Sequence, residues 1–250
     1  MTTKNRDWVD RDVSIPRFFV KSDIKLSQIV LLQKEQNLHL AKVLRKKEGD
    51  LITLFNGMGP EYSGKILKTS SERTEILITS LSLETRTPEI KIHLGLCILK
   101  KDAMNRSISR CTELGVNEIT PIISEFCAVP EKLIEKRLIN WQKIAISASE
   151  QCGLNLIPHI NPVCRMREWI FKTDGEKLMA LQSGNKLENN FFESNSASLL
   201  IGPEGGFSPD EIKYTNNDHV KKISLGKRTL RAETAPIVAI SLIHRISGEF

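Results

Sequence analysis

Cysteines are few in this 250-residue chain, and their placement excludes the usual cysteine-based scaffolds. The five cysteines are scattered, their number is odd, and none forms a C-x-x-C pair. Disulfide frameworks need an even set of cysteines, and zinc sites need closely spaced ones. We therefore expect neither, and we expect no metal site.

Long apolar runs are also missing. No run approaches the roughly 20 residues that a helix needs to cross a bilayer, and the segment from Met1 to Asp12 is too polar to be the core of a signal peptide. Hydrophobic residues make up 40% of the chain and charged residues 26%, which is the balance of a folded globular protein. We therefore expect a cytoplasmic protein with no membrane partner.

Acidic residues are outnumbered by basic ones. The 36 Lys and Arg residues face 30 Asp and Glu residues, so the formal net charge is +6. A basic balance favours a polyanionic partner such as nucleic acid. The excess is spread over both halves of the chain rather than concentrated in a tail, so the charge suggests RNA without establishing it.

Residues 1–83 have the pattern of a small β-rich module. The apolar run Leu51–Phe55 ends at Asn56-Gly57, a strong signal for a hairpin turn, and residues 64–67 supply a returning strand. A later run keeps roughly a two-residue period but changes phase at Ser80. A helix is expected over residues 35–44. These features predict a compact β-barrel.

Residues 84–250 predict an α/β domain that follows a linker over residues 84–91. A continuous apolar strand at 94–99 precedes a helix at 102–114 that ends at Gly115. Further strands are expected at 116–123, 178–181, 199–201 and 222–225. One helix face is marked by Ile134, Leu138, Trp141, Ala145 and Ala148. This alternation predicts a mostly parallel sheet covered by helices.

The stretch LLIGPEGGFSPDEI, residues 199–212, predicts a strand, a tight loop and a helix. Ser208 suits the N-cap, Pro209 the first helical position, and Glu211 completes a capping box. Glycines let the backbone approach a ligand closely, and the loop follows a strand end, where α/β sheets bind ligands. The stretch lacks the spacing of a phosphate-binding loop. A turn that only connects two elements is an equal alternative on glycine count alone.

The stretch SLGKRTLRAETAPIVAI, residues 224–240, places a basic loop before a second helix. Its loop carries Lys227, Arg228 and Arg231, and Glu233-Thr234 opens a helix that is apolar on nearly all sides. Such a helix must be buried against the sheet or a second subunit. A cationic loop beside a buried helix start suits an anionic or electron-rich ligand, although arginines in a loop are more often simply solvated.

Together these stretches resemble the ribosomal RNA uridine-N3 methyltransferase family of the knotted SPOUT superfamily. The matching motifs look like GPEGGFS-x-x-E and LG-x-R-x-LR-x-ETA. The resemblance extends to KKDAMNRSISRCTELGVNE at residues 100–118 and to residues 148–158. In the front module it includes Pro16-Arg17-Phe18, the segment 39–45 and Gly49-Asp50. It therefore covers nearly the whole chain.

The resemblance implies a PUA-like β-barrel RNA-binding domain at 1–83 and a SPOUT-type α/β domain with a deep trefoil knot at 84–250. It implies S-adenosylmethionine as the cofactor, 16S ribosomal RNA of the small subunit as the substrate, and a homodimer whose two subunits complete each active site. The implied reaction methylates N3 of a specific uridine.

The resemblance and the chemistry of the reaction together suggest residues for each role. Arg231, before Arg228, could stabilise the charge that develops when uridine N3 loses its proton. Glu233 or Glu204 is a candidate to accept that proton, although a carboxylate at a helix start is more often a capping partner. The expected RNA contacts are Arg17, His39, Lys42 and Arg45, with a solvated basic face as an equal alternative. The expected cofactor contacts are Leu181, Gly202, Glu204, Gly205, Gly206, Leu225, Gly226, Leu230, Thr234 and Ala235.

One departure from the family pattern concerns RNA binding. After Gly153 the family usually has arginine, often twice, whereas this chain has Leu154 and Leu156. Two alternatives therefore stay open. The first is a related knotted methyltransferase that acts on transfer RNA or on a ribose 2′-hydroxyl. The second is an RNA-binding ribosome-assembly factor that has lost catalysis.

Overall fold

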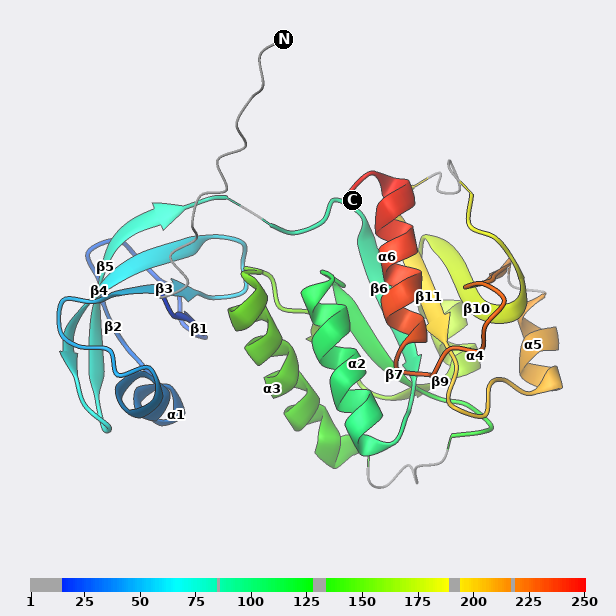
Figure 1. The fold of residues 1–250 in the computed structure, drawn as a ribbon, viewed down its shortest axis with the longest axis horizontal. Helices are drawn as coiled ribbons and strands as arrows, with labels where there is room; N and C mark the ends of the chain where they lie inside the picture. Colours follow the sequence, from blue (N-terminus) through cyan, green and yellow to red (C-terminus); the bar gives the residue numbers. More distant parts are fainter. Residues whose placement is uncertain (1–14, 85, 128–133, 189–193, 217–218) are drawn as a thin grey trace, which may run out of the picture. The chain divides into compact units, whose positions relative to one another are not determined.

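The computed structural model describes residues 15–84, 86–127, 134–188, 194–216 and 219–250 (Figure 1). The chain divides into two compact units, Met1–Thr85 and Arg86–Phe250. Each unit has its own sheet and its own hydrophobic core.

The first unit is built on a five-stranded sheet with the strand order β1-β3-β4-β5-β2. The strands β3, β4 and β5 form an antiparallel meander, β2 runs antiparallel to β5, and β1 runs parallel to β3. The predicted helix is confirmed as α1, which continues into a π-helical turn, η1. The bounds are β1 Arg17–Phe19, β2 Ile29–Leu31, α1 Lys34–Leu38, η1 His39–Val43, β3 Leu51–Phe55, β4 Glu61–Thr69 and β5 Thr74–Ser82.

The change of phase at Ser80 is confirmed as a β-bulge. Ser63 faces Ser80, whereas the next residue, Gly64, faces Ile78, so Thr79 is the extra residue of β5. A bulge re-aims the side chains that follow it. Before the bulge Ile76 and Ile78 are buried, and after it the leucines at 81 and 83 are exposed.

The second unit contains a seven-stranded sheet in which all pairings are parallel. Its order is β12-β10-β11-β6-β7-β8, and β9 also pairs with β7. This confirms the α/β class. The strand bounds are β6 Lys91–Cys97, β7 Glu118–Ile123, β8 His159–Ile160, β9 Cys164–Arg165, β10 Glu176–Asn185, β11 Ser196–Ile201 and β12 Lys221–Ile223.

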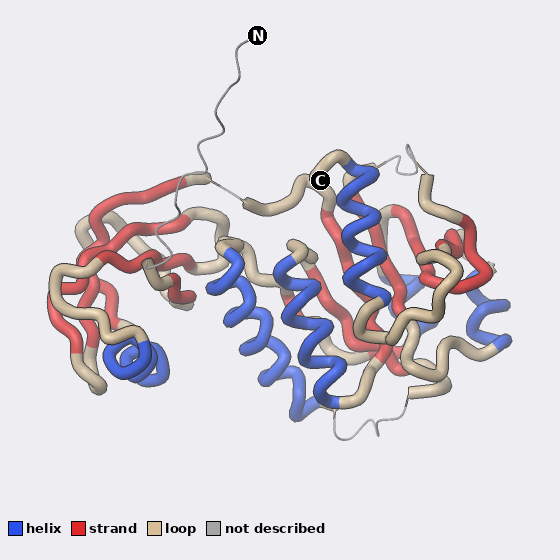
Figure 2. Tube along the Cα trace, viewed as in Figure 1, coloured by secondary structure: helices blue, strands red, loops and turns tan. Residues whose placement is uncertain are grey.

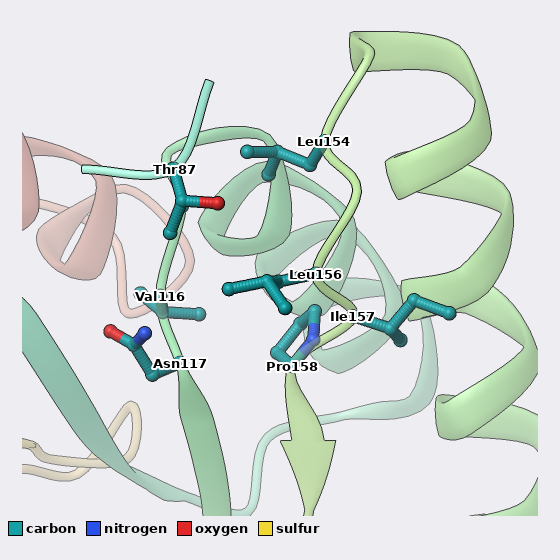
Figure 3. A pocket seen from close by; sticks show the side chains of 8 residues that line it. Thr87, Val116, Asn117, Leu154, Leu156, Ile157 and Pro158 are labelled. Carbon is teal, nitrogen blue, oxygen red and sulfur yellow. The ribbon is translucent and has the colours of Figure 1, made fainter. Parts of the chain in front are cut away.

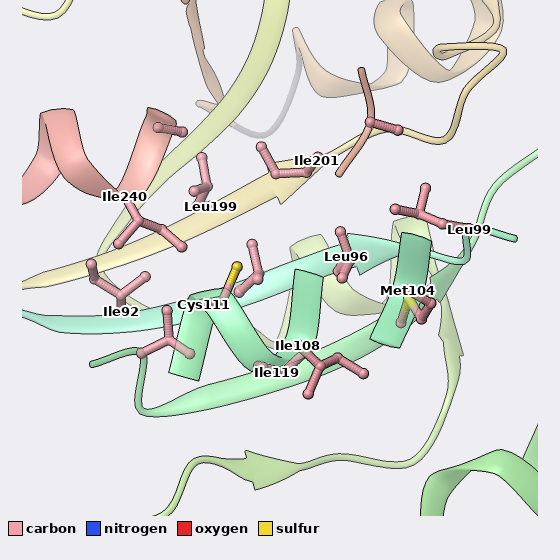
Figure 4. Packing of buried hydrophobic residues seen from close by; sticks show 14 of the residues in the cluster. Ile92, Leu96, Leu99, Met104, Ile108, Cys111, Ile119, Leu199, Ile201 and Ile240 are labelled. Atoms are coloured by element: carbon pink, nitrogen blue, oxygen red, sulfur yellow. The ribbon is translucent and has the colours of Figure 1, made fainter. Parts of the chain in front are cut away.

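Helices cover both faces of this sheet (Figures 1 and 2). Leu199 and Ile201 of β11 point into a core with residues of α2 and α6 (Figure 4), to which α3 also contributes. Leu200, between them, packs with residues of α4 and α5 on the other face. The side chains of a strand alternate between the two faces of the sheet, and helices on both sides bury both sets of side chains. The helix bounds are α2 Lys101–Glu113, α3 Glu135–Cys152, α4 Met166–Lys172, α5 Pro209–Thr215 and α6 Ala235–Ser247.

The helix end at Gly115 and the buried helix face that includes Trp141 test two predictions from the sequence. Gly115 has φ +78° just after α2, which confirms the predicted stop. Trp141 and Trp169 are buried, so both are packing residues, while Trp8 lies outside the described residues. In the described part of the chain, no helix is both long and apolar enough to cross a membrane.

Candidate active site

Two predicted loops leave the same edge of the second sheet. β11 and β12 are the neighbours of β10 on either side, and both run parallel to it. The register places Met179 opposite Leu200 and Ala180 opposite Ile223, so the two strands end at nearly the same level. Residues 202–208 and 224–234 therefore begin side by side, at the carboxyl edge where α/β sheets bind ligands.

The first loop, residues 202–208, turns sharply at its glycines. Gly206 has φ +71° and donates its N–H to the carbonyl of Pro203 at 2.9 Å. An added Cβ at Gly202 would lie 2.9 Å from the ring of Phe207, so a larger residue there would require the ring to shift. The loop then enters α5 through the predicted capping box between Ser208 and Glu211, which the structure confirms.

This loop is tied to the ends of β6 and β7. The backbone N–H of Lys100, just after β6, donates to Glu204 Oε1 at 3.3 Å. The backbone N–H of Glu125, after β7, donates to Glu211 Oε1 at 2.9 Å. Phe126 packs over Gly205, where an added Cβ would lie 3.1 Å from the Cβ of Phe126. The loop is therefore held across the ends of three strands.

The second loop, residues 224–234, is held at its start by β10. Ser224 donates its N–H to the carbonyl of Asn185 at 2.7 Å, and the side-chain amide of Gln182 donates to the carbonyl of Lys227 at 3.5 Å. Gly226 follows with φ +106°, a conformation that favours glycine. Arg228 and Arg231 are both exposed. Their guanidinium groups are thus accessible at the carboxyl edge.

Arg231 and Glu233 share a tight turn that opens α6. The carbonyl of Arg231 accepts the N–H groups of Thr234 and Ala235 at 2.9 and 3.0 Å. Glu233 Oε1 lies 3.2 Å from Arg106 Nη2 of α2. A hydrogen bond from its own backbone N–H, the ion pair with Arg106 and the charge of Arg231 lower the pKa of Glu233. This carboxylate is therefore ionised at neutral pH and is a weak proton acceptor.

The structure gathers all the expected cofactor residues along this edge. Open space lies beside Gly206 and Gly226, since an added Cβ would meet no heavy atom within 4 Å at either position. Most of the remaining positions are glycines or half-buried apolar side chains, and two of them, Glu204 and Thr234, are polar. The half-buried members are Leu181, Gly202, Gly206, Leu225, Leu230, Thr234 and Ala235, and the exposed ones are Glu204, Gly205 and Gly226. This edge can therefore accept a ligand with an apolar face.

No metal cluster accompanies these loops in the described part of the chain. There, no three His, Cys, Asp or Glu side chains are grouped so that they could hold an ion.

The expected RNA contacts lie in the first unit and divide into two kinds. Arg17 pairs with Glu61 at 2.5 Å, and its guanidinium lies 5.0 Å from the centroid of the Phe55 ring, so it is largely committed within the unit. His39, Lys42 and Arg45 are exposed. His39 and Lys42 both belong to the π-helical turn η1, and Arg45 follows it directly after Leu44.

Leu154 and Leu156 lie on the side of the sheet where the strands begin, opposite the carboxyl edge. With Val116, Pro158 and their neighbours they line a hollow of about 160 Å³ (Figure 3). These residues stand just before β7 and β8, so the hollow is at the edge where the strands begin. An RNA contact at position 154 or 156 would belong to a surface away from the glycine loop of the same chain.

The sequence analysis assigned no role to three residues that the structure places near the candidate site. Arg106 and Lys100 lie in the stretch 100–118, which carried a resemblance but no assigned role, and Phe126 lies in a short polar loop. The partners that identify them are more than 75 residues away along the chain. No local pattern signals such contacts.

Two family models match the chain, one in each unit. Residues 85–244 match an RNA methyltransferase domain, and residues 32–79 match an RNA methyltransferase PUA domain. The chain is 37% identical over 240 residues to ribosomal RNA small subunit methyltransferase E of Buchnera aphidicola subsp. Schizaphis graminum, covering 94% of this chain and 98% of the relative. The chain belongs to the ribosomal RNA small subunit methyltransferase E family.

Solved structures support this membership of the methyltransferase E family. A methyltransferase E of Neisseria gonorrhoeae bound to S-adenosyl methionine superimposes with a TM-score of 0.88 at 32% identity, covering 93% of this chain and 98% of that one. A Legionella pneumophila methyltransferase in complex with bound SAM has a TM-score of 0.87, also at 32% identity, with coverage of 92% and 97%. The family resemblance is therefore confirmed in sequence and in fold.

Proposed function

We propose that this protein transfers a methyl group from S-adenosylmethionine to N3 of a uridine in 16S ribosomal RNA. The observation that carries the proposal is the convergence of the loops 202–208 and 224–234 on one edge of the sheet, with Arg231 exposed beside them. The full-length similarity to small subunit methyltransferases E supports ribosomal RNA as the substrate.

The residues at this edge fit S-adenosylmethionine. Leu181, Leu225 and Leu230 keep apolar surface accessible for an adenine ring, and the open space beside Gly206 and Gly226 admits a ligand next to the backbone. When bound, this cofactor supplies a methyl group on a sulfonium that is already activated. The protein therefore has mainly to align the reactants and exclude water.

The arginines provide the electrostatic part of the reaction. Uridine N3 carries a weakly acidic proton, so loss of this proton puts negative charge on the base, and that charge has to be stabilised until the methyl group is transferred. Arg231, and after it Arg228, would face the carbonyl oxygens over which that charge spreads. The lowered pKa of Glu233 makes it a weak base, and its ion pair with Arg106 suits it to hold the turn rather than to remove the proton.

Both units contribute to substrate binding in this proposal. The first unit acts as a PUA-like barrel and contacts RNA phosphates through the exposed His39, Lys42 and Arg45. The second is a knotted SPOUT domain that works as a homodimer in the cytoplasm. The half-buried outer residues Ile237 and Leu242 of α6 support the dimer, because they leave apolar surface for a second subunit.

Methyl transfer to ribosomal particles tests the proposal. The purified protein is incubated with undermethylated 30S subunits and labelled S-adenosylmethionine, and the product nucleoside is identified and mapped. We expect 3-methyluridine in 16S RNA. Label on a ribose, or label that appears only when transfer RNA is offered in place of 30S subunits, would assign the chain to a related methyltransferase activity. Absence of label and of cofactor binding by calorimetry would identify a non-catalytic RNA-binding factor.

A further inference from the structure

Arg106 connects α2 to the turn that carries Arg231. Its Nη2 lies 3.2 Å from Glu233 Oε1, although the two residues are 127 positions apart in the sequence. The side chain of Glu233 is only 20% exposed, so its carboxylate is partly shielded from water. The pair therefore links a helix that follows β6 to the start of α6.

A second arginine on the same helix makes a different kind of pair. Arg110 lies one turn further along α2 and binds Glu113 of that helix at 2.8 Å. Its side chain is 61% exposed, against 60% for Arg106. The two arginines thus share helix, exposure and type of partner, and only the Arg106 pair joins separate elements.

The backbone turn that contains Glu233 also contains Arg231, and it connects the Arg106 ion pair to Arg231. The Arg231 carbonyl accepts two N–H groups at the start of α6, so the backbone of Arg231 and Glu233 belongs to one hydrogen-bonded turn. Holding Glu233 from α2 therefore restrains the backbone position from which the Arg231 side chain extends. Exposed ion pairs contribute only about 0–1 kcal/mol to stability, so this pair is better suited to setting geometry than to stabilising the fold.

We propose that Arg106 is a positioning residue that, through Glu233, holds the Arg231 turn at the carboxyl edge during methyl transfer. This inference rests on the proposed function. It predicts that loss of Arg106 slows turnover while substrate binding and folding are preserved. A direct contact of Arg106 with RNA phosphate predicts the reverse, a weaker RNA affinity with unchanged turnover.

The test compares Arg106→Gln, Arg106→Lys and the matched control Arg110→Gln in the full-length protein. Steady-state methyl transfer to undermethylated 30S subunits gives kcat and both KM values, and thermal melting reports folding. For Arg106→Gln we expect kcat to fall about ten-fold, since small displacements of aligned groups are costly, with KM values and Tm nearly unchanged. Lysine should recover part of the loss, and Arg110→Gln should behave as the wild type.

The outcomes separate this inference from the proposed function. Wild-type activity together with an unaffected kcat in Arg106→Gln would overturn the inference alone. A rise only in the KM for 30S subunits, or an equal loss in Arg110→Gln, would overturn it in favour of general phosphate attraction. A wild-type protein that binds S-adenosylmethionine but methylates no RNA would overturn the proposed function, and the inference with it.

Discussion

Glu211 joins two of the loops at the candidate active site, and its removal should loosen both. Glu211 Oε2 accepts the N–H of Ser208 at 2.9 Å, and its Oε1 accepts the N–H of Glu125 at the same distance. A hydrogen bond to a charged group contributes about 1.5–3 kcal/mol. Because Glu211 is half-buried and water competes, we expect Glu211→Ala to cost about 2–3 kcal/mol in total.

Thermal melting and calorimetry measure the two consequences. For a domain of this size 1 kcal/mol moves Tm by about 2–4 °C, so the expected fall is about 4–12 °C. The glycine loop also loses its tie to the end of β7. We therefore expect the Kd for S-adenosylmethionine to rise about ten-fold, which corresponds to about 1.4 kcal/mol.

The control is Asp210→Asn, an exposed position in the same helical turn. It should change stability by less than about 0.5 kcal/mol and leave cofactor affinity unchanged. Glu211→Gln keeps one acceptor and should fall between the two. If Glu211→Ala melted and bound cofactor like Asp210→Asn, the idea that this carboxylate holds the loops together would be refuted.

Three further changes test other parts of the second unit. In Gly95→Ala the new Cβ would lie 2.8 Å from ring atoms of Trp169, so urea unfolding should show a loss of about 1–3 kcal/mol, whereas an unchanged midpoint would mean that the ring shifts freely. Burial lowers the pKa of His93 from 6.5, so the unfolded chain takes up its proton first, and stability is complete above about pH 6.5 and declines below it. His93→Gln should reduce the decline in urea midpoint from pH 7 to 5 without abolishing it, because the pKa of His244 is lowered too; an unaltered slope would contradict this. Gly206→Ala has room for its methyl group but must keep φ +71°, so melting should show a cost of about 1–2 kcal/mol, and a neutral change would show that the turn can rearrange.

Local patterns predicted the elements whose signals are contained in a few neighbouring residues. The capping box of Ser208 and Glu211 formed as expected, because its partners are three residues apart and interact within one turn. The continuous apolar runs became the central strands β6 and β11, since both faces of a parallel sheet are buried.

Short elements at the sheet margin escaped prediction. β8 and β9 have two residues each, too few to show a period, and α4 spans only Met166–Lys172. The packing contacts of Trp169 could not be predicted either. Its ring packs on Gly95 of β6, and its Nε1–H donates to His93 Nε2 at 3.1 Å, a contact across 76 positions.

The sequence by itself determined the α/β class, the two glycine-bearing loops and the family, because these depend on ordered local motifs and on hydrophobic periodicity. Only the tertiary structure decided that the loops share one edge, that Glu204 meets the backbone of Lys100, and that Arg106 holds Glu233. Strand order and helix packing bring such partners together from more than 100 positions apart, and nothing in the spacing of neighbouring residues encodes that proximity.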